Sequence, residues 1–208
     1  MYHPRKNEKG DSVKIHYPSQ SSVINAWTDS AATACVVPDG LMPQAINGLA
    51  ITTWKDYPQT SVDWEALAET TPLTEPPFDA PAGLKKASGV VVRELDGRIW
   101  VVAPSNAFGG YKATFPKGRL EGKSAKVTAL IEAFEESGLR VRLLGYLVDV
   151  ARSTTYTRYY LAERVGGNPA DMGWESQAVI LAPLAELPVL LNSSNDLPII
   201  EALKNYDQ

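Results

Sequence analysis

Three glutamates lie close together in the second half of the chain. Glu132, Glu135 and Glu136 are spaced i, i+3 and i+4, so a helix would bring their carboxylates onto one face within about one turn. Like charges at this spacing repel each other by roughly 0.2–0.5 kcal/mol per pair. Such a helix either faces water as a solvated acidic surface or holds a cation.

The segment before these glutamates combines glycines with basic residues. Gly118 and Gly122 free the backbone of a loop, and five cations surround it, namely Lys112, Lys117, Arg119, Lys123 and Lys126. Cations suit phosphate oxygens and carboxylates suit Mg²⁺ or Mn²⁺. Together they indicate the chemistry of phosphoryl transfer, in which charge accumulates on the non-bridging oxygens.

Residues 116–139 resemble the Nudix box, G-x5-E-x7-R-E-U-x-E-E-x-G-U, where U is a bulky aliphatic residue. The three glutamates match the acid of the R-E pair and the two paired acids, and Gly138 with Leu139 matches the closing pair. Gly118 matches the opening glycine if the loop is one residue shorter than in the family. An ungapped alignment would instead place Lys117 there.

Three positions depart from the family's pattern. Ile131 stands where the family has its arginine, Lys123 where the first glutamate is expected, and Ala133 at the aliphatic position. An isoleucine cannot orient a neighbouring glutamate by a charge-assisted hydrogen bond, and a lysine repels a cation. Glu121 is the candidate replacement for the missing glutamate.

The resemblance implies Mg²⁺- or Mn²⁺-dependent hydrolysis of a diphosphate linkage in a nucleoside diphosphate joined to another group, such as ADP-ribose or a dinucleoside polyphosphate. Glu132, Glu135 and Glu136 would be the metal ligands and catalytic acids, helped by the backbone carbonyl of Gly118. Glu175 is the outlying candidate for the general base. The alternative is a nucleotide-binding or regulatory module on a catalytically weakened Nudix scaffold.

Several further residues are candidates for substrate binding. The basic candidates, for phosphate, are Lys117, Arg119, Arg152 and Arg158, and the aromatic candidates, for stacking on a base, are Phe108, Tyr111, Tyr159 and Trp174. Arginines on strands are more often solvated, and aromatic residues on strands more often belong to the core. Both of these alternatives stay open.

The elements that must position these residues are clearest after residue 84. Residues 124–137 are predicted to form a helix closed by Gly138, and residues 194–205 to contain a C-terminal helix. Strands are predicted at the β-prone runs 88–95, 99–103, 141–151, 155–165 and 177–181, the first two joined by a hairpin at Asp96-Gly97. This pattern indicates a mixed sheet with few long helices, an α+β or α/β fold. The resemblance implies an α/β/α sandwich.

The first part of the chain is less regular. Short strands are expected at 22–27, 33–37 and 50–54, a helix at 62–69, and a hairpin turn at Asp39-Gly40. Residues 71–83 carry four prolines and are therefore expected to lack regular structure. We expect an N-terminal α+β extension at 1–70, a linker at 71–83 and the Nudix domain at 84–208. The extension would serve either in dimerisation, giving a homodimer, or as a cap over the substrate.

Composition excludes several other classes. The 208 residues are 44% hydrophobic with a formal charge of −4, which is too apolar for a disordered chain and argues against binding to duplex nucleic acid. Cys35 is the only cysteine, so an intramolecular disulfide and a cysteine-based zinc site are both excluded. The polar N-terminus resembles neither a signal peptide nor a membrane anchor, so a cytoplasmic protein is expected.

Overall fold

The computed structural model describes residues 1–206, apart from the side chains of residues 107–109. Its strands are β1 Tyr2–Lys6, β2 Ser12–Lys14, β3 Ala34–Val36, β4 Ala45–Ile46, β5 Leu49–Ala50, β6 Lys85–Arg93, β7 Ile99–Pro104, β8 Lys117–Arg119, β9 Leu139–Ala151, β10 Thr155–Gly167 and β11 Ser176–Ala182. Its α-helices are α1 Asn25–Thr28, α2 Ser61–Glu69, α3 Ala125–Ser137, α4 Leu187–Leu190 and α5 Leu197–Asn205. Four 3₁₀ turns complete it, η1 Ser105–Gly110, η2 Pro169–Asp171, η3 Leu184–Glu186 and η4 Ser194–Asp196.

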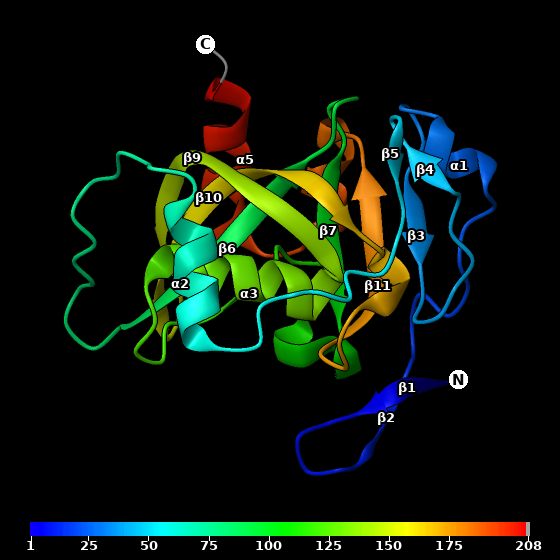
Figure 1. The fold of residues 1–208 in the computed structure, drawn as a ribbon, viewed down its shortest axis with the longest axis horizontal. Coiled ribbons are helices and arrows are strands. Elements are labelled where there is room, and N and C mark those ends of the chain that lie inside the picture. Colours follow the sequence, from blue (N-terminus) through cyan, green and yellow to red (C-terminus); the bar gives the residue numbers. More distant parts are fainter. Residues whose placement is uncertain (207–208) are drawn as a thin grey trace.

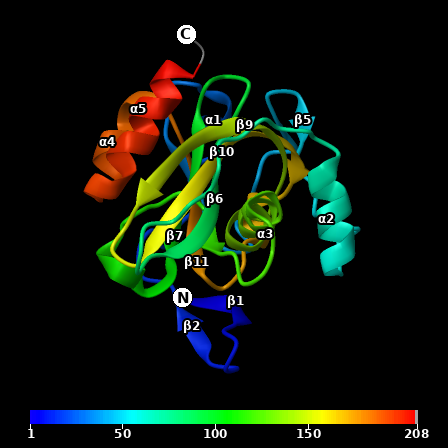
Figure 2. The same ribbon diagram turned by 90° about the vertical axis from the view of Figure 1, so that its left-hand side faces the viewer.

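A mixed sheet forms the centre of the molecule. Six strands follow the order β3-β11-β7-β6-β10-β9, and β8 pairs with β6 off this path. Strands β6 and β10 run parallel, and the other pairs are antiparallel. Figure 2 shows α4 and α5 on one side of the sheet and α3, with α2 beyond it, on the other. This arrangement confirms the predicted α/β/α sandwich with a mixed sheet.

Helix α3 forms where its capping residues predict. The Ser124 side chain accepts a hydrogen bond from the backbone N–H of Val127, and Gly138 ends the helix in the left-handed region at φ 68°. Val127 and Leu130 are buried against the sheet, which leaves the glutamate face turned away from this core.

The elements predicted after residue 84 are confirmed. The Asp96-Gly97 turn joins β6 to β7, with Gly97 at φ 85°. Helix α2 and the irregular, proline-rich segment 71–83 are confirmed as well.

Three expectations for the first part of the chain were wrong. Residues 22–27 do not form a strand, because Trp27 turns into the core at the end of the short helix α1. Residues 50–54 contribute only the end of β5, which pairs with β4 across a turn at Asn47-Gly48. Asp39 does adopt φ 58°, but no hairpin forms there because β3 pairs with β11 instead.

Strand β3 belongs to the central sheet, so the N-terminal extension is part of this architecture. Its residues Trp27, Ile46 and Trp64 lie in the same hydrophobic cluster as residues of α3 and β6. Figure 1 shows the β1–β2 hairpin projecting at one end of the molecule. The division of the chain into domains at residues 71–83 stays a prediction.

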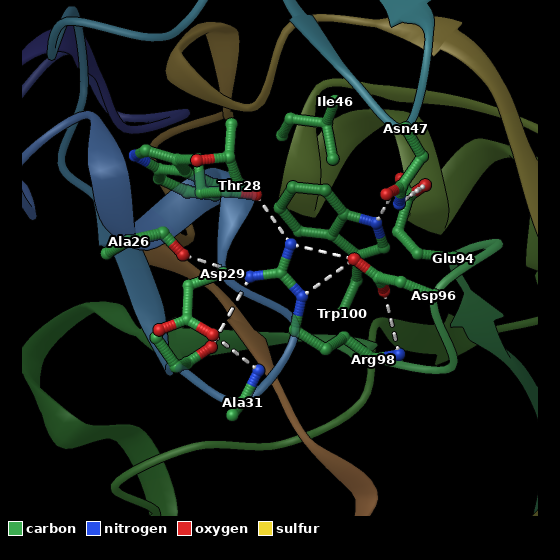
Figure 3. Close-up of polar contacts among 12 residues, drawn as sticks. Ala26, Thr28, Asp29, Ala31, Ile46, Asn47, Glu94, Asp96, Arg98 and Trp100 are labelled. Atoms are coloured by element: carbon green, nitrogen blue, oxygen red, sulfur yellow. Dashed lines mark hydrogen bonds and ion pairs between the residues drawn. The ribbon is translucent and has the colours of Figure 1, made fainter.

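Polar residues of the turn between β6 and β7 also hold the extension (Figure 3). The guanidinium of Arg98, which is 1% exposed, donates to the backbone carbonyls of Ala26 and Ala32 and to Asp96. Glu94 accepts from the indole N–H of Trp100 at 3.0 Å and from the Asn47 amide at 3.0 Å. The Arg98 bond to the Ala26 carbonyl satisfies a group that the short helix α1 leaves unpaired.

None of the helices in the described part of the chain is long and apolar enough to cross a membrane.

Candidate active site

Strand β8 and helix α3 bring the opening glycine and the first of the three glutamates into contact. The carboxylate of Glu132 lies so close to Gly118 that a Cβ atom at position 118 would overlap it. The structure therefore gives a steric reason for a glycine at this position. Gly118 and its neighbour Lys117 both lie against the acidic face of the helix.

Glu136 is the most buried of the three α3 glutamates. The residue is 7% exposed, and its Oε2 atom is buried with no hydrogen-bond partner among the described residues. Burial raises the pKa of Glu136, while the charge of Lys117 and a backbone hydrogen bond from Lys117 oppose that rise. A buried carboxylate oxygen without a partner is costly unless something else binds it.

The carboxylates repel one another across this face. Burial raises the pKa of Glu132 well above its ordinary value, and the charges of Glu136, Glu135 and Glu175 raise it further. Burial and then Glu175 raise the pKa of Glu135. A cation bound among these carboxylates would offset both the cost of burying them and the repulsion between them.

Glu175 comes from the bend before β11. The Ser105 backbone N–H donates to the Glu175 carbonyl at 2.7 Å, which ties this bend to the end of β7. Burial raises the pKa of Glu175, with a further contribution from Glu8 in the β1–β2 hairpin. Glu175, the candidate general base from outside residues 116–139, therefore lies close to the α3 glutamates.

Three cavities meet at Glu175. The first, which we call the carboxylate cavity, measures about 520 Å³ and has both acidic and basic walls. Its charged lining residues are Glu8, Lys117, Arg119, Glu121, Lys123, Glu132, Glu135 and Glu175. Glu132, Glu135 and Glu175 thus share one cavity with Lys117 and Arg119, two of the cations predicted to bind phosphate.

The Tyr111 cavity, of about 340 Å³, adjoins it on the side of β7. Tyr111, Trp174 and Ser105 line this cavity together with Lys117, Glu136 and Glu175. The Lys117 Nζ atom lies 6.0 Å from the centre of the Tyr111 ring. Two of the predicted stacking residues therefore face a cavity next to the acids.

The Tyr57 cavity, of about 470 Å³, shares Glu175 with the carboxylate cavity and Trp174 with the Tyr111 cavity. Its lining comes partly from the N-terminal extension, through Arg5, Lys6, Glu8, Tyr57, Pro58, Gln59 and Trp64. Phe134 and Glu135 of α3 and the bend 173–175 complete it. Glu8, Tyr57 and Gln59 carry no motif, so the sequence offered no signal for their place here.

Three other predicted substrate contacts, Arg152, Arg158 and Tyr159, do not line these cavities. Arg152 is buried, paired with Asp196, and its guanidinium lies 5.7 Å from the centre of the buried Tyr159 ring. The guanidinium of Arg158 is occupied by Asp149 at 2.8 Å and Glu75 at 3.0 Å. The side chain of Phe108 lies outside the described residues. The roles predicted for these four residues stay predictions.

Two of the positions that depart from the family's pattern, Lys123 and Ile131, also line the carboxylate cavity. Lys123 lowers the pKa of Glu135 by its charge, whereas Glu121 raises it, so both lie within electrostatic range of that carboxylate. Ile131 packs partly against the core and cannot hydrogen-bond a neighbouring glutamate. Glu121 lines the same cavity, and its role as the replacement acid stays a prediction.

The donor set suits a hard divalent cation. Among the described residues no three acidic, histidine or cysteine side chains already converge in a complete metal-binding arrangement. Even so, the unpartnered Glu136 oxygen and the close approach of Glu132 to the Gly118 backbone present oxygen donors of the kind that Mg²⁺ and Mn²⁺ bind.

Comparisons with known proteins agree with this arrangement. A family model described as the NUDIX domain matches residues 83–203. A Mycobacterium tuberculosis protein, provisionally named mutator protein MutT4, is 27% identical over 129 residues, which cover 55% of this chain and 52% of that protein. The chain therefore spans about half the length of this curated relative.

Two solved structures share the fold. An ADP-ribose pyrophosphatase from Streptococcus suis 89-1591 has a TM-score of 0.50 at 19% identity, covering 60% of this chain and 92% of its own. A MutT protein from Methanosarcina mazei Go1 has a TM-score of 0.50 at 12% identity, covering 62% of this chain and 99% of its own. At these identities the likeness extends to the fold alone.

Proposed function

The chain belongs to the Nudix family, and from that premise we propose that it hydrolyses a diphosphate linkage in a nucleoside diphosphate joined to a second group. The observation that carries this proposal is the carboxylate cavity. Its walls hold Glu132, Glu135 and Glu175 beside Lys117 and Arg119. A cavity with both signs of charge can bind a divalent cation and a diphosphate at the same time.

Glu132, Glu135 and Glu136, with the Gly118 carbonyl, would hold the cation. Mg²⁺ or Mn²⁺, when bound, neutralises charge on the phosphate oxygens and lowers the pKa of a water molecule. Lys117 and Arg119 bind non-bridging oxygens of the diphosphate and orient it against the carboxylates. The aromatic faces of Tyr111 and Trp174 bind the nucleoside base in the Tyr111 cavity.

The chemical step consumes one water molecule. The water oxygen forms a bond to one phosphorus atom, and the bond from that phosphorus to the bridging oxygen breaks. The bridging oxygen keeps the electron pair and leaves on the second phosphate. The Glu175 carboxylate accepts the proton that the water loses, because Glu175 lies where the three cavities meet.

Replacing Glu136 by Gln tests this proposal. The change keeps the shape of the side chain but removes a buried negative charge, so we expect turnover to fall by about a hundred-fold or more. Product release from ADP-ribose, a UDP-sugar and diadenosine tetraphosphate would be measured with Mg²⁺ and with Mn²⁺. Glu186→Gln, an exposed glutamate outside the three cavities, is the matched control.

The folded state of each variant is checked by its thermal unfolding midpoint. Wild-type turnover in a folded Glu136→Gln protein would contradict the proposal. Nucleotide binding by the wild type without turnover of any compound would instead favour a binding module, the function that Ile131 and Lys123 left open.

A further inference from the structure

Three residues lie in a row across three neighbouring strands of the central sheet. Lys117 of β8 pairs with Gly89 of β6, and Gly89 pairs with Tyr159 of β10. Residues that lie directly opposite each other on neighbouring strands point to the same face of a sheet. The side chains of Lys117 and Tyr159 therefore leave the sheet on one face, on either side of a residue that has no side chain.

Gly89 lets these two side chains approach each other. A Cβ atom at position 89 would lie 2.7 Å from Cε1 of Tyr159, 2.8 Å from Cβ of Lys117 and 2.6 Å from the Pro116 carbonyl oxygen. A glycine inside a strand often marks such a close approach. The Tyr159 ring thus lies beside the base of the Lys117 side chain. At the other end of that side chain, Nζ lies 6.0 Å from the centre of the Tyr111 ring.

The face that Lys117 and Tyr159 share is the one covered by α4 and α5 (Figure 2). Tyr159 belongs to the same hydrophobic cluster as Leu203 of α5. Gly118, the next residue of β8, instead faces Glu132 of α3. Burial and neighbouring carboxylates raise the pKa of Glu132, and the charge of Lys117 opposes that rise. The Lys117 side chain therefore begins on the face away from α3, yet its charge acts on an α3 carboxylate.

The Tyr159 ring is held from two further directions. It is fully buried, the Phe115 ring meets it edge-on with their centres 6.1 Å apart, and the Arg152 guanidinium lies 5.7 Å from its centre. Asp196, which is also fully buried, forms an ion pair with Arg152. Burial raises the pKa of Asp196, and the charges of Arg152 and Lys117 oppose that rise, so Lys117 lies within electrostatic range of this ion pair.

We propose that Tyr159 is a positioning residue for Lys117, and that the buried ion pair of Arg152 with Asp196 holds the Tyr159 ring in place. The ring restricts the directions in which the Lys117 side chain can leave β8, and so it directs the ammonium towards the diphosphate. This inference rests on the proposed function, in which Lys117 binds a non-bridging oxygen. It gives Tyr159 and Arg152 a role that acts through Lys117 instead of a contact with the substrate.

Tyr159→Leu tests this proposal in the full-length chain, with Tyr160→Leu as its matched control. Tyr160 is equally buried but belongs to the hydrophobic cluster on the α3 side of the sheet. We expect Tyr159→Leu to weaken the binding of inorganic diphosphate in the presence of Mg²⁺, and to lower kcat/KM for ADP-ribose, by about ten-fold each. Tyr160→Leu should leave both values near wild type. Calorimetry measures the binding, and the thermal unfolding midpoint shows that each variant is folded.

A double-mutant cycle separates positioning from packing. Lys117→Met removes the ammonium that Tyr159 is proposed to position, so adding Tyr159→Leu to it should cause almost no further loss of affinity or kcat/KM. A purely structural role of Tyr159 would give the same loss in both backgrounds. Tyr159→Phe keeps the ring and should have wild-type values.

Gly89→Ala provides the same test from the other side of the contact, should Tyr159→Leu fail to fold. The added methyl group would displace the Tyr159 ring or the base of the Lys117 side chain, so we expect a loss that again disappears in the Lys117→Met background. Gly166→Ala is its control, since a Cβ atom there would lie 3.7 Å from its nearest neighbour.

The outcomes separate this proposal from the hydrolase function. Equal losses with and without the Lys117 ammonium, wild-type values in a folded Tyr159→Leu protein, or an equal loss in Tyr159→Phe would overturn the positioning role and leave the hydrolase function intact. Diphosphate affinities that show the expected dependence on Lys117, without turnover of any compound, would support the positioning role and overturn the hydrolase function. A wild type that neither binds diphosphate nor turns over any compound overturns both.

Discussion

Gly118 is the glycine of the site whose missing side chain leaves room for a proposed metal ligand. The Glu132 carboxylate fills the space that a Cβ atom would need, so even the smallest side chain must displace a proposed metal ligand. Gly118, which lies in β8, thus acts by leaving room for the Glu132 carboxylate.

Gly118→Ala should therefore lower kcat by about a hundred-fold while changing stability little, because a shift of about 1 Å in a positioned group costs that much. Turnover and the thermal unfolding midpoint measure the two effects. Gly166→Ala is the matched control, since a Cβ atom there would lie 3.7 Å from its nearest neighbour. Full activity in Gly118→Ala would show that Glu132 need not hold this position.

At the residue scale, the sequence predicted the acids better than the cations. Spacing along a helix is local, so the positions of Glu132, Glu135 and Glu136 in the chain are enough to place them on one face. Arg158 could not be placed in the same way. Its partner Glu75 lies 83 positions away, in the proline-rich segment, and only the folded chain brings the two together.

Elements whose ends carry their own signals were predicted well. Ser124 and Gly138 mark the ends of α3, and Asp96-Gly97 marks the turn between β6 and β7. Asn47-Gly48 carries the same kind of turn signal, which could have revealed the β4–β5 hairpin.

Helix α1 shows why other elements were missed. Val23 and Ile24 favour a strand, but the buried Trp27 side chain stacks on Trp100, with their ring centres 5.9 Å apart. Arg98 then binds the carbonyls that the short helix leaves free. Tertiary contacts therefore override the local preference.

At this element scale we expect Arg98→Leu to lower the free energy of unfolding by about 3 kcal/mol. The change leaves Asp96 and several buried carbonyls without their donor. Urea unfolding measures the loss. Arg142→Leu is the control, because that arginine is 61% exposed and its ion pair with Glu163 should contribute less than about 1 kcal/mol. Equal losses in the two variants would mean that the Arg98 network does not anchor the extension.

For the whole molecule, the mild net charge of −4 conceals an uneven distribution. Residues 1–82 hold 5 basic and 10 acidic side chains, and residues 83–208 hold 15 and 14. The acidic extension nevertheless presents Arg5 and Lys6, together with Glu8, to the Tyr57 cavity.

The packing of the N-terminal extension against the rest of the chain was the feature that the sequence predicted least well. Its length and the proline-rich segment predicted a boundary, but they gave no sign that β3 would join the central sheet or that Tyr57 would contact α3. Such contacts depend on how distant segments pack, and no motif of the extension encodes them. The two expected roles, a dimerisation element and a cap over the substrate, stay predictions.

The central claim is that the α3 glutamates bind a divalent cation beside the diphosphate. A crystal structure with Mn²⁺ and a non-hydrolysable dinucleoside polyphosphate tests it most directly, because the anomalous signal locates the metal. We predict Mn²⁺ bound by carboxylates of Glu132, Glu135 and Glu136, with the phosphate chain against Lys117. Mn²⁺ bound elsewhere, or a phosphate chain held without any contact to these glutamates, would contradict it.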